Sequence, residues 1–197
     1  MIDLTANISG FFHERLAAAL DRHGLRVTPS TEAYLVQLLV EFGSTPLADG
    51  WEGTLVERLA VATRIPEPSE RFRRFRDIGD RTLYTCGFFL DHLEHRGLSK
   101  GYVVAMGGRA YVEAGALARR PSVPVERGLA DVYPELADKF ERFTGVFDDI
   151  RECTALRTPQ DIVRVYERWK RTGSQLLAER LEEEGVFPQQ TKRGVLH

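Results

Sequence analysis

Residues 79–118 read GDRTLYTCGFFLDHLEHRGLSKGYVVAMGGRAYVEAGALA, and this stretch predicts two apolar helices with Gly97 between them. The segment 82–90 carries no charge, so a helix formed there is apolar on every side and has to be buried. The segment is far shorter than the roughly 20 residues that a bilayer requires, which favours a core helix over a membrane span. Ser99 is a good N-cap for the second helix.

We therefore expect two central helices at about 79–96 and 99–118, with small residues where they meet. Glycine lowers helix stability by about 1 kcal/mol relative to alanine, a cost that is tolerated where a second backbone must come close. The pattern favours close helix packing, and the other interpretation is a space left for a flat cofactor. The small residues are Gly79 and Gly87 on the first helix and Gly107, Gly108, Ala110, Ala114, Gly115 and Ala118 on the second.

Arg109 and Glu113 are the only charged residues in the segment 101–118, and their spacing of four places them on one helix face. In such an apolar helix we expect both to be at least partly buried, and buried charges are normally paired. One interpretation is an internal salt bridge. The other is that Arg109 holds an anionic ligand or a partner's carboxylate, in a site that Tyr84, Tyr111 and Glu113 also line.

The remaining pattern predicts an all-α single domain, a bundle of about seven helices over residues 1–185. Two of these helices, at about 134–156 and 158–184, should be antiparallel neighbours because their connection is short. Residues 186–197 are expected to form a flexible C-terminal tail. The N-terminus has no basic segment before its first apolar run, which indicates neither a signal peptide nor a membrane span and favours a cytoplasmic protein.

The composition is that of an ordinary globular protein, with 43% hydrophobic and 28% charged residues and a net charge of -2. This charge gives no general attraction to nucleic acid or to an anionic membrane. The arginine-rich segment 70–81 alternates its signs at a spacing of four, which favours a solvated helix face with ion pairs over a face that binds phosphate or a partner protein. Those pairs are Glu70 with Arg74, Arg76 with Asp80, and Asp77 with both Arg73 and Arg81.

His92 and His95 form the only histidine cluster and are weak candidates for metal ligands, because a metal site needs three or four ligands. With His13 and His23 they are also the candidate axial ligands of a haem, but nothing selects one of them. No nucleophile elbow, dinucleotide fingerprint or phosphate loop is present in the sequence. We therefore predict no cofactor, no metal and no catalytic residue.

The pattern Gly79-Asp80-x-x-Leu83-Tyr84-x-x-Gly87-Phe88-Phe89 is followed by Tyr102 to Tyr111 with Met106-Gly107. In these segments the chain resembles a group of uncharacterised, all-helical bacterial proteins of about this length. The likeness extends to Tyr166-Glu167-Arg168-Trp169 and Thr172-Gly173-Ser174. The resemblance implies a bacterial, soluble, single-domain protein and brings no activity or cofactor with it.

Two functions follow as expectations from these observations. The first, which the sequence favours, is a non-enzymatic and regulatory helical protein that acts by binding another protein or a second copy of itself as a homodimer. The second is a helical bundle that binds a small molecule or haem, with its site near the small-residue seam of the central helices. A bound chromophore would distinguish the two.

Overall fold

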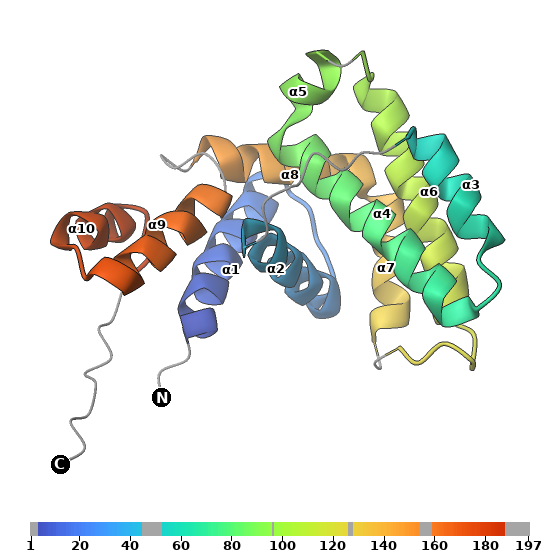
Figure 1. Cartoon of the computed structure of the whole chain (residues 1–197), viewed down its shortest axis with the longest axis horizontal. Coiled ribbons are helices and arrows are strands. Elements are labelled where there is room, and N and C mark those ends of the chain that lie inside the picture. The colour runs from blue at the N-terminus through green and yellow to red at the C-terminus, as the bar shows by residue number, and fades with distance from the viewer. Residues whose placement is uncertain (1–3, 45–52, 96, 126–127, 154–158, 188–197) are drawn as a thin grey trace.

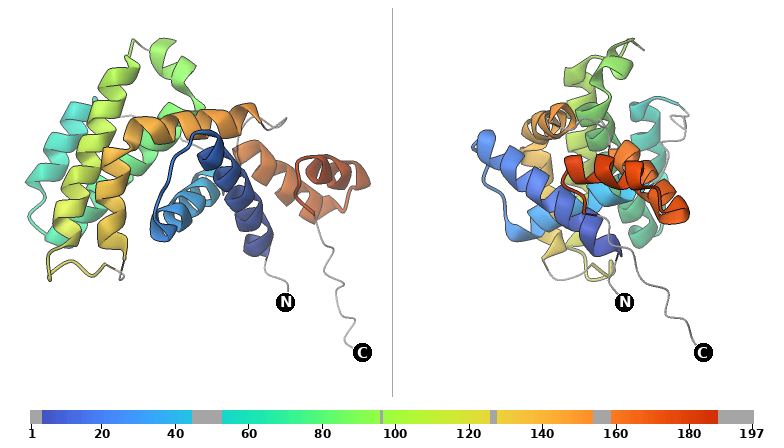
Figure 2. Two further views of the ribbon diagram at one scale, coloured as in Figure 1. Left: turned by 180° about the vertical axis from the view of Figure 1, so that it is seen from behind. Right: turned by 90° about the vertical axis from the view of Figure 1, so that its left-hand side faces the viewer.

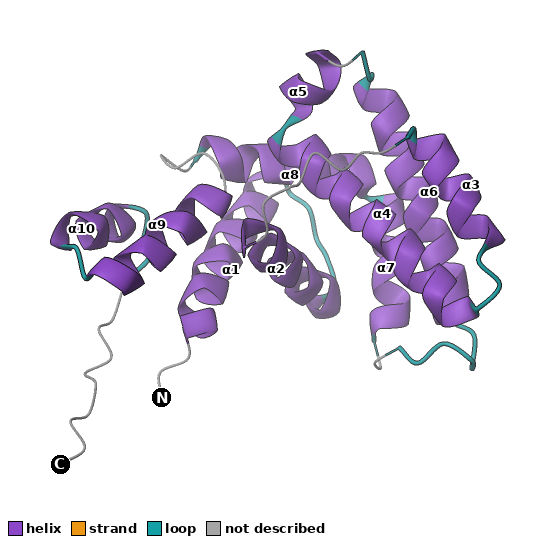
Figure 3. Cartoon of the chain, in the orientation of Figure 1, coloured by secondary structure: helices purple, strands orange, loops and turns teal. Residues whose placement is uncertain are grey.

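The computed structural model contains ten helices and no strand within the residues that it describes (Figures 1 and 3). This confirms the all-α class and gives more helices than the seven or so expected. Within the described residues, none of the helices combines the length and apolar character needed to cross a bilayer. The described residues are 4–44, 53–95, 97–125, 128–153 and 159–187.

The helices follow one another along the chain with short connections. Three of them arise because a predicted helix is interrupted: at Phe89, at Lys139, and at Gly173, whose φ of 63° is left-handed. The bounds are α1 (Leu4–Arg22), α2 (Pro29–Ser44), α3 (Leu55–Arg64), α4 (Pro68–Phe88), α5 (Leu90–His95), α6 (Lys100–Ala118), α7 (Leu129–Asp138), α8 (Phe140–Glu152), α9 (Pro159–Thr172) and α10 (Gln175–Glu183).

The two central helices are α4 and α6, which pack along each other with α3 and α7 beside them (Figure 1). Helix α6 matches its predicted range, and Ser99 accepts a hydrogen bond from a first-turn amide as expected. Helix α4 was predicted wrongly at both ends. It begins at Pro68 because Glu67 caps it, and it ends at Phe88. The arginine-rich segment and the apolar run therefore belong to one helix.

The seam between α4 and α6 is closely packed rather than open. A Cβ atom added to Gly79 would lie 2.6 Å from the ring of Tyr111. One added to Gly107 would lie 2.2 Å from Cζ of Phe140, at the start of α8. Real side chains do not tolerate such distances, so these glycines allow aromatic rings to fill the space against the helix backbone.

The remaining helices form a second group of α1, α2, α9 and α10, and α8 runs between the groups, packing on α4 and on α1 (Figure 2). The expected antiparallel pairing of the last two predicted helices is wrong, since α9 packs mainly against α2 and α10. The predicted start of the tail is also too early, because Val186 is fully buried and donates its amide to Leu181. Residues 188–197 of that tail lie outside the described residues.

Candidate functional site

The four residues predicted to line a ligand site do not come together in the fold. Tyr84 and Tyr111 are both fully buried, and the Tyr84 ring stacks on Phe42 with centroids 5.1 Å apart. Arg109 and Glu113 form the predicted ion pair, with Nε and Oε1 3.1 Å apart. The expected burial holds for Glu113, whose side chain is 37% exposed, but it is wrong for Arg109, whose side chain is 66% exposed. Both residues line a hollow between α3 and α6.

A cluster that the sequence did not reveal surrounds Asp80 in the middle of α4. Its Oδ1 atom accepts a 2.6 Å hydrogen bond from the hydroxyl of Tyr34 on α2 and a 2.8 Å bond from that of Tyr111 on α6. Its Oδ2 atom lies 3.8 Å from Nε of Arg76. Tyr133 of α7 packs edge-on against Tyr34, with ring centroids 5.7 Å apart. The carboxylate thus joins side chains of α2, α4 and α6, and α7 completes the cluster through the contact of Tyr133 with Tyr34.

Burial dominates the electrostatics of this cluster. It raises the pKa of Asp80 from 3.8 to about 7, although the hydrogen bonds from Tyr34 and Tyr111 and the charge of Arg76 act in the opposite direction. Burial and the neighbouring carboxylate also raise the pKa values of both tyrosines well above the ordinary range, and that of Tyr133 to about 12. A carboxyl group whose pKa is raised this far, and which also lines a pocket, is a candidate functional group.

The sequence predicted that Asp80 lies on a solvated helix face and takes part in an ion pair there. The pair with Arg76 is present, but the Asp80 side chain is only 13% exposed, so this part of the face is not solvated. One signal could have indicated this: Asp80 lies two residues before Thr82, where the run that is apolar on all sides begins.

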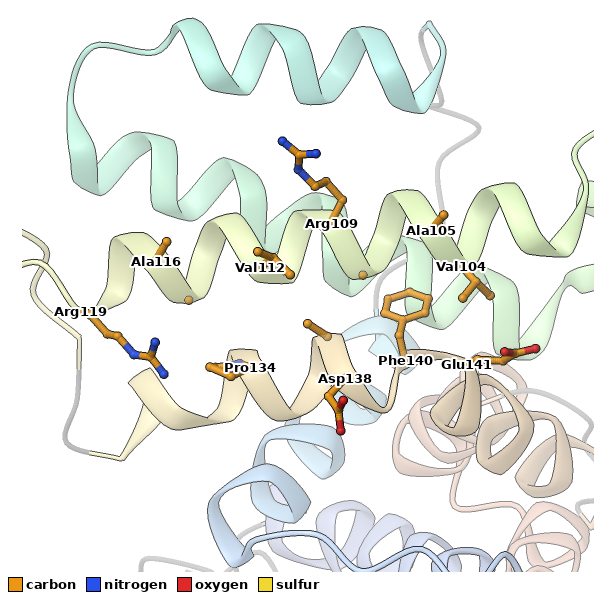
Figure 4. Close-up of a pocket in the computed structure, with 13 residues that line it drawn as sticks. Val104, Ala105, Arg109, Val112, Ala116, Arg119, Pro134, Asp138, Phe140 and Glu141 are labelled. Atoms are coloured by element: carbon orange, nitrogen blue, oxygen red, sulfur yellow. The ribbon is translucent and has the colours of Figure 1, made fainter.

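A second feature is an apolar groove between α6 and α7 with a volume of about 720 Å³ (Figure 4). Its walls include Val104 and Val112 of α6 and Pro134 of α7, and the side chain of Val112 is among the exposed large hydrophobics at 55%. Gly108, which was expected to make a close helix contact, lines this groove instead. A Cβ atom there would have no neighbour nearer than 3.7 Å.

The charges of the groove are separated along its length. Arg119 lies at one end, beside Pro134, and Glu141 lies at the other, beside Val104 (Figure 4). Arg109 points away from α7, toward the side of α6 where it pairs with Glu113. Asp138 of α7 also lines the groove, between these ends, and its side chain points away from α6. The groove therefore has apolar walls with a positive charge at one end and a negative charge at the other.

The histidines do not assemble into a metal centre in the part of the chain that the structure describes, where no group of three or more His, Cys, Asp or Glu side chains could hold an ion. The exposed His95 ends α5, whereas the side chain of His92 lies outside the described residues. His13 lies 3.3 Å from Glu32, and His23 lies 3.7 Å from Asp149.

Two places thus combine accessible space with functional side chains, the α6–α7 groove and the Asp80 cluster. Comparison of the chain with protein-family models, with curated proteins and with solved structures finds no match.

Proposed function

We propose that this protein acts by protein–protein interaction, and that the α6–α7 groove is the surface that binds a second copy of the chain. The observation that carries the proposal is the groove itself, with its apolar walls, its exposed Val112 and its two oppositely charged ends. Exposed apolar surface of this kind, bordered by charge, is typical of interaction sites.

The outer face of α6 is suited to another helix. The exposed positions along it include Ala105 and Ala116, and Gly108 lies between them. Small side chains let two helix axes approach to about 8–10 Å. A helix laid against this face would bury Val112 and cover the apolar wall of the groove, which supplies the favourable free energy of association.

The charge distribution favours a second copy over an unrelated chain. A two-fold axis through the middle of the groove makes the two α6 helices antiparallel and exchanges its ends. Arg119 of each copy then faces the end of the groove where Glu141 of the other lies, so the same attraction is formed twice. Complementary charge of this kind fixes the register of an interface and speeds association.

The test is the oligomeric state measured by light scattering after size-exclusion chromatography. The parent chain should form a dimer that dissociates on dilution, and Val112→Glu should be a monomer because it places a charge in the apolar contact. The matched control is Val61→Glu on α3, where the valine is equally exposed at 54% and lies outside the groove. That variant should dimerise like the parent.

A charge exchange tests the two-fold arrangement itself. Arg119→Glu and Glu141→Arg should each weaken the dimer, because each places like charges together at both ends. The double variant restores opposite charges and should dimerise again. A monomeric parent chain at every concentration, or a double variant no better than the singles, overturns the proposed arrangement.

A further inference from the structure

The Asp80 cluster borders a cleft of about 410 Å³ that is lined by α2, α4 and the start of α7. Helix α2 contributes Tyr34, Gln37 and Glu41, helix α4 contributes Arg76 and Asp80, and the start of α7 closes the remaining side. The cleft is separate from the α6–α7 groove, and no residue lines both. It therefore allows a function that the proposed dimer does not use.

One part of the cleft is suited to a carboxylate. The Nε atom of Arg76 is buried and has no hydrogen-bond acceptor among the described residues, since 3.8 Å to Asp80 is too long for a hydrogen bond. The side chain as a whole is 43% exposed, and it lines the cleft. The first turn of α7 adds amides, because its N-cap Gly128 has no side chain to bind them.

The other part is suited to an amine. Both tyrosines bind the same oxygen of Asp80, while the second oxygen faces the side of Arg76. Glu41 adds another carboxylate at the exposed edge of the cleft. An ammonium group between these two carboxylates would have charge-assisted acceptors, and it would balance the negative charge that the lining carries when Asp80 is ionised.

We infer that this cleft binds a free α-amino acid, with its carboxylate on Arg76 and the α7 amides and its ammonium between Asp80 and Glu41. A simple anion would be repelled by the two carboxylates, and a simple cation would leave Nε of Arg76 without a hydrogen-bond acceptor. A zwitterion is the ligand class that satisfies both. The volume of the cleft leaves room for an amino-acid side chain beside the two charged groups.

Binding should depend on pH because the ammonium favours the ionised form of Asp80. The pKa of Asp80 is about 7 in the free protein, so affinity should rise as the pH is raised through neutrality. The pKa values of Arg76, Tyr34, Tyr111 and Tyr133 are all raised above ordinary values that already lie at 10 or higher, so these four groups stay protonated over that range. Glu41 is the other charged group that acts on this carboxylate.

The first experiment is isothermal titration calorimetry of the full chain with each of the protein amino acids at millimolar concentration. At least one should bind, and its primary amide and its deaminated acid should each bind at least about tenfold more weakly. Each of these two probes lacks one of the charged groups. The inference is overturned when no amino acid binds, or when either probe binds as well as the intact amino acid.

Variants then locate the binding site. Arg76→Gln and Asp80→Asn should each lower the affinity by about tenfold or more. Arg74→Gln and Asp77→Asn remove the same charges from other positions of α4 and are the matched controls. Ala33→Trp fills the mouth of the cleft from an exposed position of α2, keeps every charge, and should also abolish binding.

The proposed site is wrong if Ala33→Trp still binds the amino acid, or if Arg74→Gln and Asp77→Asn lose as much affinity as Arg76→Gln and Asp80→Asn. The Ala33→Trp result applies even if Asp80→Asn fails to fold. Val112→Glu should bind the amino acid like the parent chain, since the groove and the cleft are separate. This control distinguishes failure of the amino-acid site from failure of the proposed dimer.

Discussion

Tyr111 donates a 2.8 Å hydrogen bond to Asp80, and the ring of the same tyrosine fills the space beside the preceding residue, Gly79. Two consecutive residues of α4 thus hold one side chain of α6, the glycine by leaving room for the ring and the aspartate by accepting from its hydroxyl. This arrangement fixes the register of the two central helices, and it also leaves a carboxylate in the core.

The buried carboxylate makes stability depend on pH. Because the pKa of Asp80 is raised from 3.8 to about 7, folding favours the protonated form. Its contribution is therefore fully present below about pH 4 and is lost as the pH rises through 7, a change of at most roughly 4 kcal/mol. Urea unfolding of the parent chain across this range should show the decline, and Asp80→Asn should remove most of it.

Asp77→Asn is the control for this measurement, because Asp77 lies one turn away from Arg81 at the surface and forms a 2.6 Å ion pair with it. In this variant the free energy of unfolding should fall with pH as steeply as in the parent chain. If it falls equally steeply in the parent chain and in Asp80→Asn, the raised pKa is not a property of Asp80.

Two adjacent glycines of α6 should respond in opposite ways to alanine. Gly107→Ala places a methyl group 2.2 Å from Phe140 and 2.8 Å from Thr82, so it should destabilise the fold by about 1–3 kcal/mol through overpacking. Gly108→Ala meets no atom nearer than 3.7 Å and should stabilise the helix by up to about 1 kcal/mol. Thermal melting of the two variants checks both changes in stability. Equal changes in the two variants would contradict the close packing at Gly107 and the free space at Gly108.

Local patterns were sufficient for the helical class and for the central pair. Helix α6 could be located because its N-cap Ser99 is adjacent in sequence to its apolar run. The small residues correctly indicated close packing, and at Gly87 the neighbour is Phe147 of α8, whose side chain leaves no room for a Cβ atom on the glycine. The prediction failed at Gly108, which lines the groove, so the sequence indicates that glycines pack closely in this pair of helices but not which of them do, or which ring fills each space.

The Asp80 cluster could not be predicted in this way, because its partners are remote. Tyr34 is 46 residues away and Tyr111 is 31 residues away, and only the packing of α2 and α6 on α4 removes the carboxylate from water. Spacing within α4 therefore indicated a surface ion pair. The exposure of Arg109 was also not predicted, because a sequence does not show how closely a neighbouring helix such as α3 covers one face of α6.

Glu135 should produce a pH dependence of the opposite sign. Burial alone would raise its pKa, but hydrogen bonds from Lys139, Thr31 and Thr28 outweigh it and lower the pKa to about 2. Its contribution is present above about pH 4.5 and is lost as the pH falls through 2, an effect of at most roughly 3 kcal/mol. Glu135→Gln should therefore have a lower urea midpoint than the parent chain at neutral pH. The two midpoints should become more similar as the pH is lowered toward 2.

The ion pair of Arg109 and Glu113 should contribute little to stability. Its Nε–Oε1 distance is 3.1 Å, but the arginine is 66% exposed, and exposed pairs contribute about 0–1 kcal/mol. Melting of Arg109→Met, Glu113→Gln and the double variant gives the coupling energy as a thermodynamic cycle. The cycle belongs in the Val112→Glu background, where the proposed dimer cannot add contacts to this face. A coupling above about 2 kcal/mol there would mean that the pair is shielded from solvent within a single chain, contrary to the open outer face of α6.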